Sequence, residues 1–250
     1  MSQPGDTHDT RRARREASFF DSLATSEQAR EDLRSGSYET ITQAAIECFA
    51  ASLRTSSVHL ELGAGTQPFS VLVPSDSRAV CIDVSFESLR LAKRRSPQLD
   101  YVCCDAGHLP FRDAVFDGVI GSAILHHLQP ASCAPEILRV RRPGAVAAFS
   151  EPQAGNVAIW LFRRLHPERY SPDERPLSAS DLRAWACDGS AQPQWLELLG
   201  IVCSIVPAVR KHRWVLAMFR SIDALIARWF PPLRPLFRYV IIEHRKPYAA

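Results

Sequence analysis

The first stretch of the chain that could do chemistry is a glycine-rich turn that follows a short apolar run. Val58 to Leu62 alternates apolar and polar residues, which is typical of a strand, and Gly63-Ala64-Gly65-Thr66 breaks that run. Pro68 then suits the first turn of a helix. A strand, a glycine turn and a helix start bring backbone N–H groups to the carboxyl end of a strand, where open α/β sheets bind ligands. Taken alone, the turn is compatible with any nucleotide ligand and also with a plain tight connection.

Further carboxylates and a histidine pair come after the next apolar runs of the chain. Asp83 lies twenty residues after Gly63, the spacing at which a carboxylate reaches ribose hydroxyls. Because a parallel sheet places the carboxyl ends of its strands along one edge, we expect all of these side chains around one site. Each aspartate alone could also be an ordinary loop or N-cap residue. The set is Asp83 at the end of 78–83, Asp105 after 99–104, His126 and His127 after 116–125, and Glu151 after 145–150.

Helical segments separate these runs. Residues 85–95 have Ser85 as an N-cap, basic residues in the last turn and Pro97 beyond the end, and 131–140 also has a helical pattern. The alternation of strand and helix predicts the α/β class, with a doubly wound, mostly parallel sheet and helices on both faces. Before the first strand, we expect a disordered basic arm over 1–15 and two helices within 16–54.

The composition places the chain among ordinary globular proteins. Its 250 residues are enough for one large α/β domain, and its net charge of +3 is too small to predict a nucleic-acid partner. The seven cysteines are scattered without a CxxC pair, so we expect neither a metal site nor a disulfide framework. No secretory signal and no spanning helix are evident, which favours a cytoplasmic protein.

The residues after the glycine turn narrow the choice of ligand. A dinucleotide fingerprint requires a glycine at its sixth position, where this chain has Pro68, so a pyrophosphate is disfavoured. A ligand with an adenosine end and an amino-acid end fits better. Glu61 would then lie near an ammonium group, Asp83 would bind ribose hydroxyls, and Asp105 would accept from the adenine amino group.

Five segments together resemble a known family in order and spacing: ELGAGT, CID before a helix ending LAKRR, CDAGHLPF, FDGVIGSAILHHL and LRVRRPGAVAAFSEP. They are similar to the motifs of the class I S-adenosylmethionine-dependent methyltransferases over about 57–152. The resemblance implies a seven-stranded Rossmann-like sheet whose last strand is antiparallel, with S-adenosylmethionine as cofactor. Gln67 and Ala145 replace two glycines usual in that family. By position, the implied cofactor-binding residues are Glu61, Gly63, Ala64, Gly65, Asp83, Val84, Asp105, Ala106 and Ser122.

The implied reaction is methyl transfer to a small-molecule acceptor, either a biosynthetic intermediate or a lipid-linked compound. His126, His127 and Glu151 are the candidate catalytic residues, because a general base can remove the acceptor's proton. A histidine pair at this place can equally be structural. Two alternatives stay open: a protein that binds the cofactor without turnover and acts as a regulatory partner, and, less favoured, an NAD-type oxidoreductase.

The chain after Glu151 is less informative. We expect a substrate-side insertion over about 154–195, in which Trp160, His166, Arg169 and Tyr170 would line the acceptor pocket, and strands at 201–209 and 237–243. Residues 214–230 form an amphipathic pattern within a helix of about 213–230. This helix is expected to pack against the sheet, and Trp214 to Phe230 would also suit a peripheral contact with an anionic membrane. The oligomeric state is not predicted.

Overall fold

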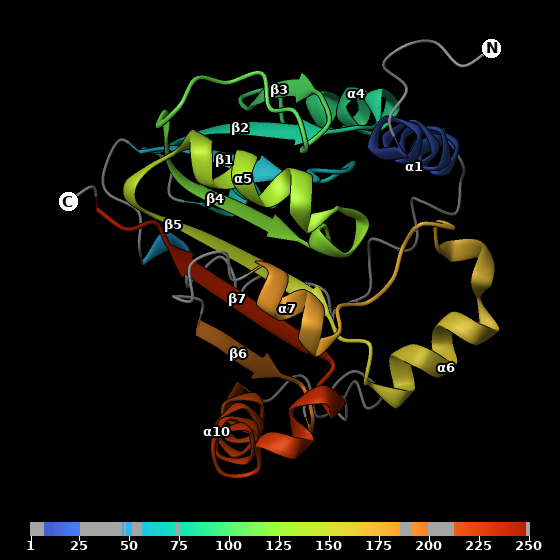
Figure 1. The fold of residues 1–250 in the computed structure, drawn as a ribbon, viewed down its shortest axis with the longest axis vertical. Coiled ribbons are helices and arrows are strands. Elements are labelled where there is room, and N and C mark those ends of the chain that lie inside the picture. Colours follow the sequence, from blue (N-terminus) through green and yellow to red (C-terminus); the bar gives the residue numbers. More distant parts are fainter. Residues whose placement is uncertain are drawn as a thin grey trace.

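One mixed sheet forms the centre of the protein. The structure, a computed structural model, describes residues 8–25, 47, 49–51, 57–73, 76–185, 192–199 and 213–248. Seven strands are ordered β3-β2-β1-β4-β5-β7-β6 (Figure 1). Strands β1 to β5 are parallel and β7 is antiparallel to both of its neighbours, which confirms the predicted sheet. The bounds are β1 Val58–Leu62, β2 Arg78–Asp83, β3 Asp100–Cys103, β4 Phe116–Ser122, β5 Arg141–Pro152, β6 Gln192–Leu196 and β7 Tyr239–Arg245.

Helices surround this sheet, and α5 and α7 lie over the face nearest the viewer in Figure 1. Helix α4 begins as predicted, because the Ser85 hydroxyl accepts a hydrogen bond from the Ser88 N–H at 3.0 Å. The helices are α1 His8–Thr25, α4 Phe86–Arg95, α5 Pro130–Val140, α6 Val157–Leu165, α7 Ala179–Trp185 and α10 Arg213–Trp229. Short 3-10 segments are η1 Phe69–Leu72, η2 Leu125–His127, η3 Pro167–Arg169 and η4 Pro231–Leu236.

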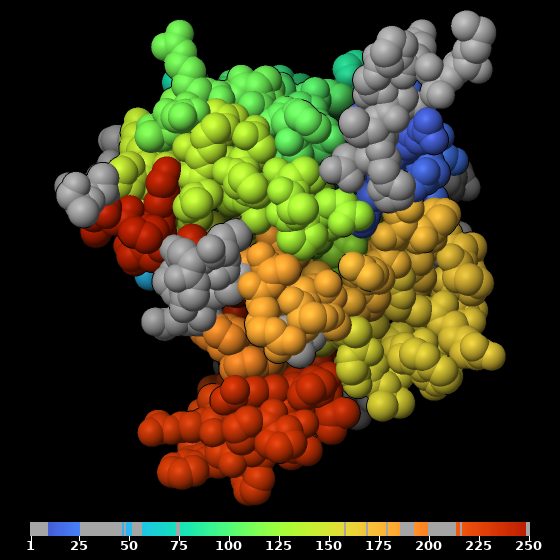
Figure 2. Space-filling view, viewed as in Figure 1, coloured from blue at the N-terminus to red at the C-terminus, as the bar shows by residue number. Residues whose placement is uncertain are grey.

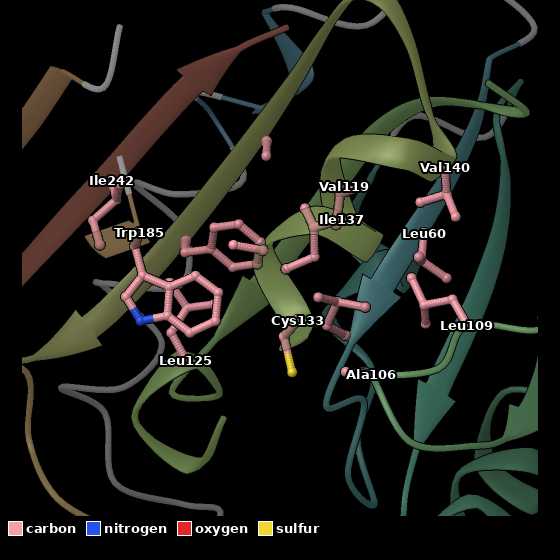
Figure 3. Close-up of a cluster of buried hydrophobic side chains, with 14 of the residues drawn as sticks. Leu60, Ala106, Leu109, Val119, Leu125, Cys133, Ile137, Val140, Trp185 and Ile242 are labelled. Atoms are coloured by element: carbon pink, nitrogen blue, oxygen red, sulfur yellow. The ribbon is translucent and has the colours of Figure 1, made fainter. Parts of the chain in front are cut away.

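The main hydrophobic core lies between the sheet and the helices α5 and α7. Leu60 and Val119 from the sheet are fully buried, and they belong to one cluster with Ile137 of α5 and Trp185 of α7 (Figure 3). Burial of each such side chain stabilises the fold by about 1.5–3 kcal/mol. The core therefore fixes the central strands, whose carboxyl ends carry the residues of interest.

The beginning of the chain differs from the prediction. Helix α1 begins at His8, so the expected disordered arm over 1–15 is wrong from that residue onward, and 1–7 lie outside the described residues. The arm has too few apolar residues to predict a packed helix. Its charged side chains are instead paired with a distant segment: Arg15 forms an ion pair with Asp173, with 2.7 Å between Nε and Oδ2.

The end of the chain also needs correction. The sixth strand of the sheet is β6, which overlaps the end of the segment expected to be an insertion over about 154–195. The strand expected at 201–209 and most of the second helix expected within 16–54 fall outside the described residues. The last strand is confirmed, displaced by two residues to Tyr239–Arg245, and the expected amphipathic helix is α10. Within the described ranges, no helix is both long and apolar enough to cross a bilayer.

Candidate active site

A cavity of about 320 Å³ lies at the carboxyl ends of the parallel strands. Its walls come from the segments that follow β1, β2, β3 and β4, from α1, and from residues after α6. The structure thus brings together most of the residues that strand order alone had placed on one edge. The predicted residues that line the cavity are Gly63, Gly65, Asp83, Val84, Asp105, Ala106, His126 and His127; those that do not are Glu61, Ala64, Ser122 and Glu151.

The glycine turn is tied to the tip of β2. Gly63 and Gly65 have φ angles of 65° and 54°, a left-handed conformation that glycine adopts without strain. The Ala64 N–H donates to the Ile82 carbonyl at 3.0 Å, and the Gly65 N–H donates to Oδ2 of Asp83 at 2.9 Å. The turn therefore depends on Asp83 for its shape.

Asp83 also reaches the start of α4. Its Oδ1 accepts from the Ser85 N–H at 2.8 Å, so each carboxylate oxygen already holds one backbone amide. Burial raises the pKa of Asp83, and the hydrogen bonds from Ser85 and Gly65 oppose that increase. Each oxygen keeps a further acceptor position, and the side chain lines the cavity. Asp83 can therefore accept hydrogen bonds from ligand hydroxyls.

Asp105 occupies the equivalent position after β3. Its Oδ1 accepts from the Gly107 N–H at 2.9 Å, and the His108 imidazole lies 3.8 Å from Oδ2. Val84 and Ala106 add apolar wall between the two aspartates. A planar, nitrogen-rich ring with an exocyclic amino group would find both apolar contact and an acceptor here.

Glu61 has a different role from the predicted one. Its side chain is fully buried beneath the turn, where its oxygens accept from the Phe69 N–H at 3.1 Å and the Ser70 N–H at 2.9 Å. The Cys81 thiol lies 3.7 Å from Oε2. The carboxyl group thus organises the start of η1 from inside and does not face the cavity, so it does not meet a ligand's ammonium group.

Glu61 gives a testable pH dependence. Burial raises its pKa to about 7 from 4.5, partly offset by hydrogen bonds from Ser70 and Phe69. The folded protein holds the proton of Glu61 more tightly than the unfolded chain does. The resulting stability is fully present below pH 4.5 and is lost as the pH rises through 7. Between pH 4.5 and 8, the free energy of unfolding of the wild type should fall by on the order of 3 kcal/mol relative to that of Glu61→Gln. Urea unfolding at several pH values would measure it, and a pH-independent difference between the two proteins would contradict it.

Glu151 supports the loop after β4 in the same way that Glu61 supports the glycine turn. It is fully buried, and Oε1 accepts from the N–H groups of Ile124 at 2.9 Å and Leu125 at 2.8 Å. Its Oε2 lies 2.7 Å from Nδ1 of His126. Glu151 therefore lies behind the loop that carries the histidine pair.

His126 lies between two carboxylates. Burial lowers its pKa, but hydrogen bonds to Glu151 and Glu174 outweigh burial and raise it to about 9. The Nε2 atom is 3.4 Å from Oε1 of Glu174. With this raised pKa the ring is already protonated at neutral pH, so the pairing does not favour His126 as a general base.

Helix α1 and residues 170–174 complete the cover of the cavity. Arg12, Glu16 and Phe20 of α1 line the cavity, as do Tyr170 and Glu174. The cover is held by hydrogen bonds: the Ser171 hydroxyl donates to Glu16, and Arg12 Nη2 donates to the Asp173 carbonyl at 3.1 Å. These contacts tie α1 to residues 170–174, so the two segments form one polar wall of the cavity.

Little in the sequence indicated this cover. Among the residues predicted for the acceptor pocket, Tyr170 lines the cavity, whereas Trp160 and His166 do not. Arg169 lies in η3, and its side chain falls outside the described part of the structure. Glu16 and Glu174 were missed, because each is one acid in a charged segment. Only the fold shows that Glu16 lies 3.1 Å from the imidazole of His127, 111 residues away.

Comparison with known proteins agrees with this fold. Residues 60–149 match a methyltransferase domain family. A demethylmenaquinone methyltransferase of Streptomyces griseus is 32% identical over 220 residues, which cover 78% of this chain and 94% of that protein. That of Paenarthrobacter aurescens is 31% identical, over 56% of this chain and 60% of that protein. The match thus spans less than two thirds of that relative.

Solved structures share the architecture. The N-methyltransferase NodS from Bradyrhizobium japonicum, in complex with S-adenosylhomocysteine, is 11% identical, with a TM-score of 0.61 over 93% of this chain and 99% of that one. At this identity the likeness concerns the fold alone. The sheet order and the relatives together show that the chain belongs to the class I S-adenosylmethionine-dependent methyltransferase family, with its Rossmann-like fold.

Proposed function

We propose that the protein transfers a methyl group from S-adenosylmethionine to a small-molecule acceptor. The observation that carries this proposal is the single cavity shared by the glycine turn, by Asp83 at the tip of β2 and by Asp105 after β3. Family membership supports the same activity. The ordered arrangement suits a ligand that is a nucleoside at one end.

The residues present fit the cofactor. A Cβ built on Gly65 would have no atom within 4 Å, so the turn leaves open space where a ligand can approach its backbone. Asp83 and Val84 would bind the ribose, and Asp105 and Ala106 the adenine. The backbone of Gly63, Ala64 and Gly65 would meet the methionine moiety. Ser122 is buried at the end of β4 and would act through the neighbouring backbone, because Ala123 is the residue that lines the cavity.

The protein's own contribution is positioning. S-adenosylmethionine supplies an activated methyl group on its sulfonium, so the chain must align an acceptor and exclude water. The cover formed by α1 and residues 170–174 suits the second task. His127 lines the cavity, with Nδ1 held 3.1 Å from Glu16, and is the predicted catalytic residue best placed to contact an acceptor. His126 and Glu151 are better suited to positioning the loop.

Two measurements test this function against its alternatives. Calorimetry with S-adenosylhomocysteine and with NAD separates a methyltransferase from an oxidoreductase. We expect binding of the first and none of the second. A radiolabelled methyl-transfer screen over small-molecule and lipid extracts then separates an enzyme from a cofactor-binding regulatory protein. Binding without any labelled product would favour the regulatory alternative, and binding of NAD alone would contradict the proposal.

An exposed apolar surface on α10 and beside η4 supports a proposal about the kind of acceptor. Trp214, Met218, Leu225 and Trp229 are 42–69% exposed, and their spacing places them along one side of α10. Phe230, which follows the helix, is also exposed at 58%. Figure 2 shows this part as a red projection at the lower end of the molecule. The helix thus buries some apolar residues against the fold and presents others outward.

Helix α6 presents a second apolar face at the same end of the molecule (Figure 1). Its Val157, Trp160, Leu161 and Leu165 are 48–67% exposed. The two surfaces are joined where the Asn156 amide donates to the Leu236 carbonyl of η4 at 2.7 Å. The surface formed by α6, α10 and η4 is named the apolar end.

The apolar end also carries interfacial features. The guanidinium of Arg164 lies 5.9 Å from the ring centroid of Trp160, and that of Arg228 lies 5.5 Å from that of Trp229. Tryptophans beside arginines are typical of a protein surface at an anionic membrane. Arg163 of α6 also forms an ion pair with Glu174, which lines the cavity. We therefore propose peripheral membrane binding through α6 and Trp214 to Phe230, and a lipid-linked acceptor.

Membrane binding is expected to depend on these side chains. Replacing both Trp214 and Trp229 by alanine should lower co-sedimentation with phosphatidylglycerol vesicles about 10-fold or more, because burial of one aromatic side chain contributes about 1.5–3 kcal/mol. The pair Trp160→Ala and Leu165→Ala should have a similar effect. Phe86→Ala is a matched control, because Phe86 is 61% exposed on α4, outside the apolar end. Equal binding by wild type and both double variants would contradict the proposal.

A further inference from the structure

Three side chains converge on the acceptor side of the cavity. The Nε2 atom of His126 lies 3.4 Å from one carboxylate oxygen of Glu174, and Nε2 of His127 lies 3.8 Å from the other. One ligand atom from each of the three residues lies within 4.8 Å of the other two. Ligand atoms around a tetrahedral zinc ion are about 3.4 Å apart, as expected from bonds of about 2.1 Å. Small rotations of these side chains would therefore complete such a site.

Both imidazoles are already oriented as metal ligands usually are. Nδ1 of His126 lies 2.7 Å from Glu151, and Nδ1 of His127 lies 3.1 Å from Glu16. An ionised carboxylate only accepts, so each Nδ1 donates a hydrogen to it, and each Nε2 lies on the side of Glu174. A carboxylate behind each histidine is the usual outer shell of a protein metal site. All of the carboxylates concerned are at least nine-tenths buried.

We propose that His126, His127 and Glu174 bind one divalent transition-metal ion, with zinc, cobalt or iron as the chemical class. Two imidazoles and one carboxylate are the donor set that these ions prefer, whereas magnesium and calcium prefer oxygen ligands alone. The sequence did not predict this site, because Glu174 is 47 positions beyond His127 in a charged, proline-rich segment.

The neighbouring charges are compatible with a cation. Arg163 forms an ion pair with Glu174, and Ser171 donates its N–H to Oε2 of Glu174 at 3.4 Å. Arg163 pairs with Oε1, the oxygen near His126, and Ser171 donates to Oε2, the oxygen near His127, so both groups fix the carboxylate in place. Without a metal, the protonated ring of His126 bridges the two carboxylates, with Nδ1 toward Glu151 and Nε2 toward Glu174. A metal ion would replace the proton on Nε2, which would leave to solvent, and would replace the interaction of Nε2 with Glu174.

The ion would have an open side. His126, His127 and Glu174 all line the cavity, so coordination positions that the protein leaves free would face the space where an acceptor enters. A metal there can bind an acceptor oxygen and lower its pKa, which favours loss of its proton. This catalytic consequence rests on the proposed methyl transfer, whereas the metal site itself does not.

The test is metal binding by the full chain, purified without a histidine tag and stripped with a chelator. Calorimetric titration with Zn²⁺ and absorption titration with Co²⁺ should each show one ion per chain, and Zn²⁺ should raise the melting temperature. His127→Asn and Glu174→Gln should each weaken Zn²⁺ binding at least about 100-fold. Glu16→Gln should weaken it about 10-fold, because outer-shell changes typically cost about 10–100-fold.

His108→Asn is the matched control, because His108 is an exposed histidine that also lies beside a carboxylate, that of Asp105, and is not one of the proposed ligands. It should leave Zn²⁺ binding unchanged. Absence of Zn²⁺ and Co²⁺ binding by a wild-type protein that still binds S-adenosylhomocysteine would overturn the metal site and leave the proposed function standing. Equal weakening by His108→Asn would overturn it as well. Metal binding without cofactor binding would support the site and count against the methyltransferase.

Discussion

Replacing Asp83 by alanine is expected to weaken binding of S-adenosylhomocysteine at least about 100-fold, equivalent to ~2.8 kcal/mol. The substitution removes the acceptors for the N–H groups of Gly65 and Ser85, so the glycine turn loses its tie to β2. It also removes the group proposed to bind the ribose hydroxyls. Each buried amide that loses its partner costs about 1–3 kcal/mol, which makes the turn adopt another shape. Isothermal titration calorimetry measures the loss.

Asp100→Ala is the matched control for this experiment. Asp100 begins β3, at the other end of the strand from the cavity, and forms an ion pair with Arg78 that is mostly exposed. Exposed pairs contribute about 0–1 kcal/mol, so this variant should bind like wild type. If a folded Asp83→Ala protein bound S-adenosylhomocysteine within about threefold of wild type, the assignment of Asp83 would be wrong.

Replacing Gly63 by alanine is expected to lower the free energy of unfolding by about 3 kcal/mol. A left-handed φ of 65° costs an alanine about 1–2 kcal/mol. The new Cβ would also lie only 2.5 Å from Cδ1 and 2.7 Å from Cγ1 of Ile124, and such overpacking costs about 1–3 kcal/mol. Urea unfolding in the absence of cofactor measures the sum.

Gly65→Ala and a double variant separate these two costs. Gly65 has a similar φ of 54°, but its added Cβ would have no atom within 4 Å, so Gly65→Ala should cost only about 1–2 kcal/mol. Adding Ile124→Ala to Gly63→Ala should cost less than the sum of the single changes, because it removes the overlap. The contact with Ile124 would have no effect if Gly63→Ala and Gly65→Ala lowered the free energy of unfolding equally and if the effects of Gly63→Ala and Ile124→Ala were fully additive.

The sequence predicted the sheet edge well because that part of the fold is encoded locally. Strands 58–62 and 78–83 were predicted with the bounds that the structure has, and their apolar runs end where the polar residues begin. The position of Asp83 can be inferred from this pattern, since a residue at the tip of a parallel strand lies at the edge of the sheet. The position of the Glu61 side chain cannot be inferred in this way, because Glu61 lies inside the strand. The direction of the side chain then decides whether it contacts a ligand or the core.

By itself, the sequence determined the α/β class, the mostly parallel sheet and the edge where a cofactor would bind, because these features depend on local periodicity and on chain order. The number of strands and the antiparallel last strand came from the resemblance of its motifs to a known family. Only the tertiary structure decided that Glu61 and Glu151 lie beneath the loops they support, and that α1 and residues 170–174 line the cavity. The reason is physical: the contacts of Glu16 with His127 and Ser171 join residues 111 and 155 positions apart. No local pattern records such a pairing.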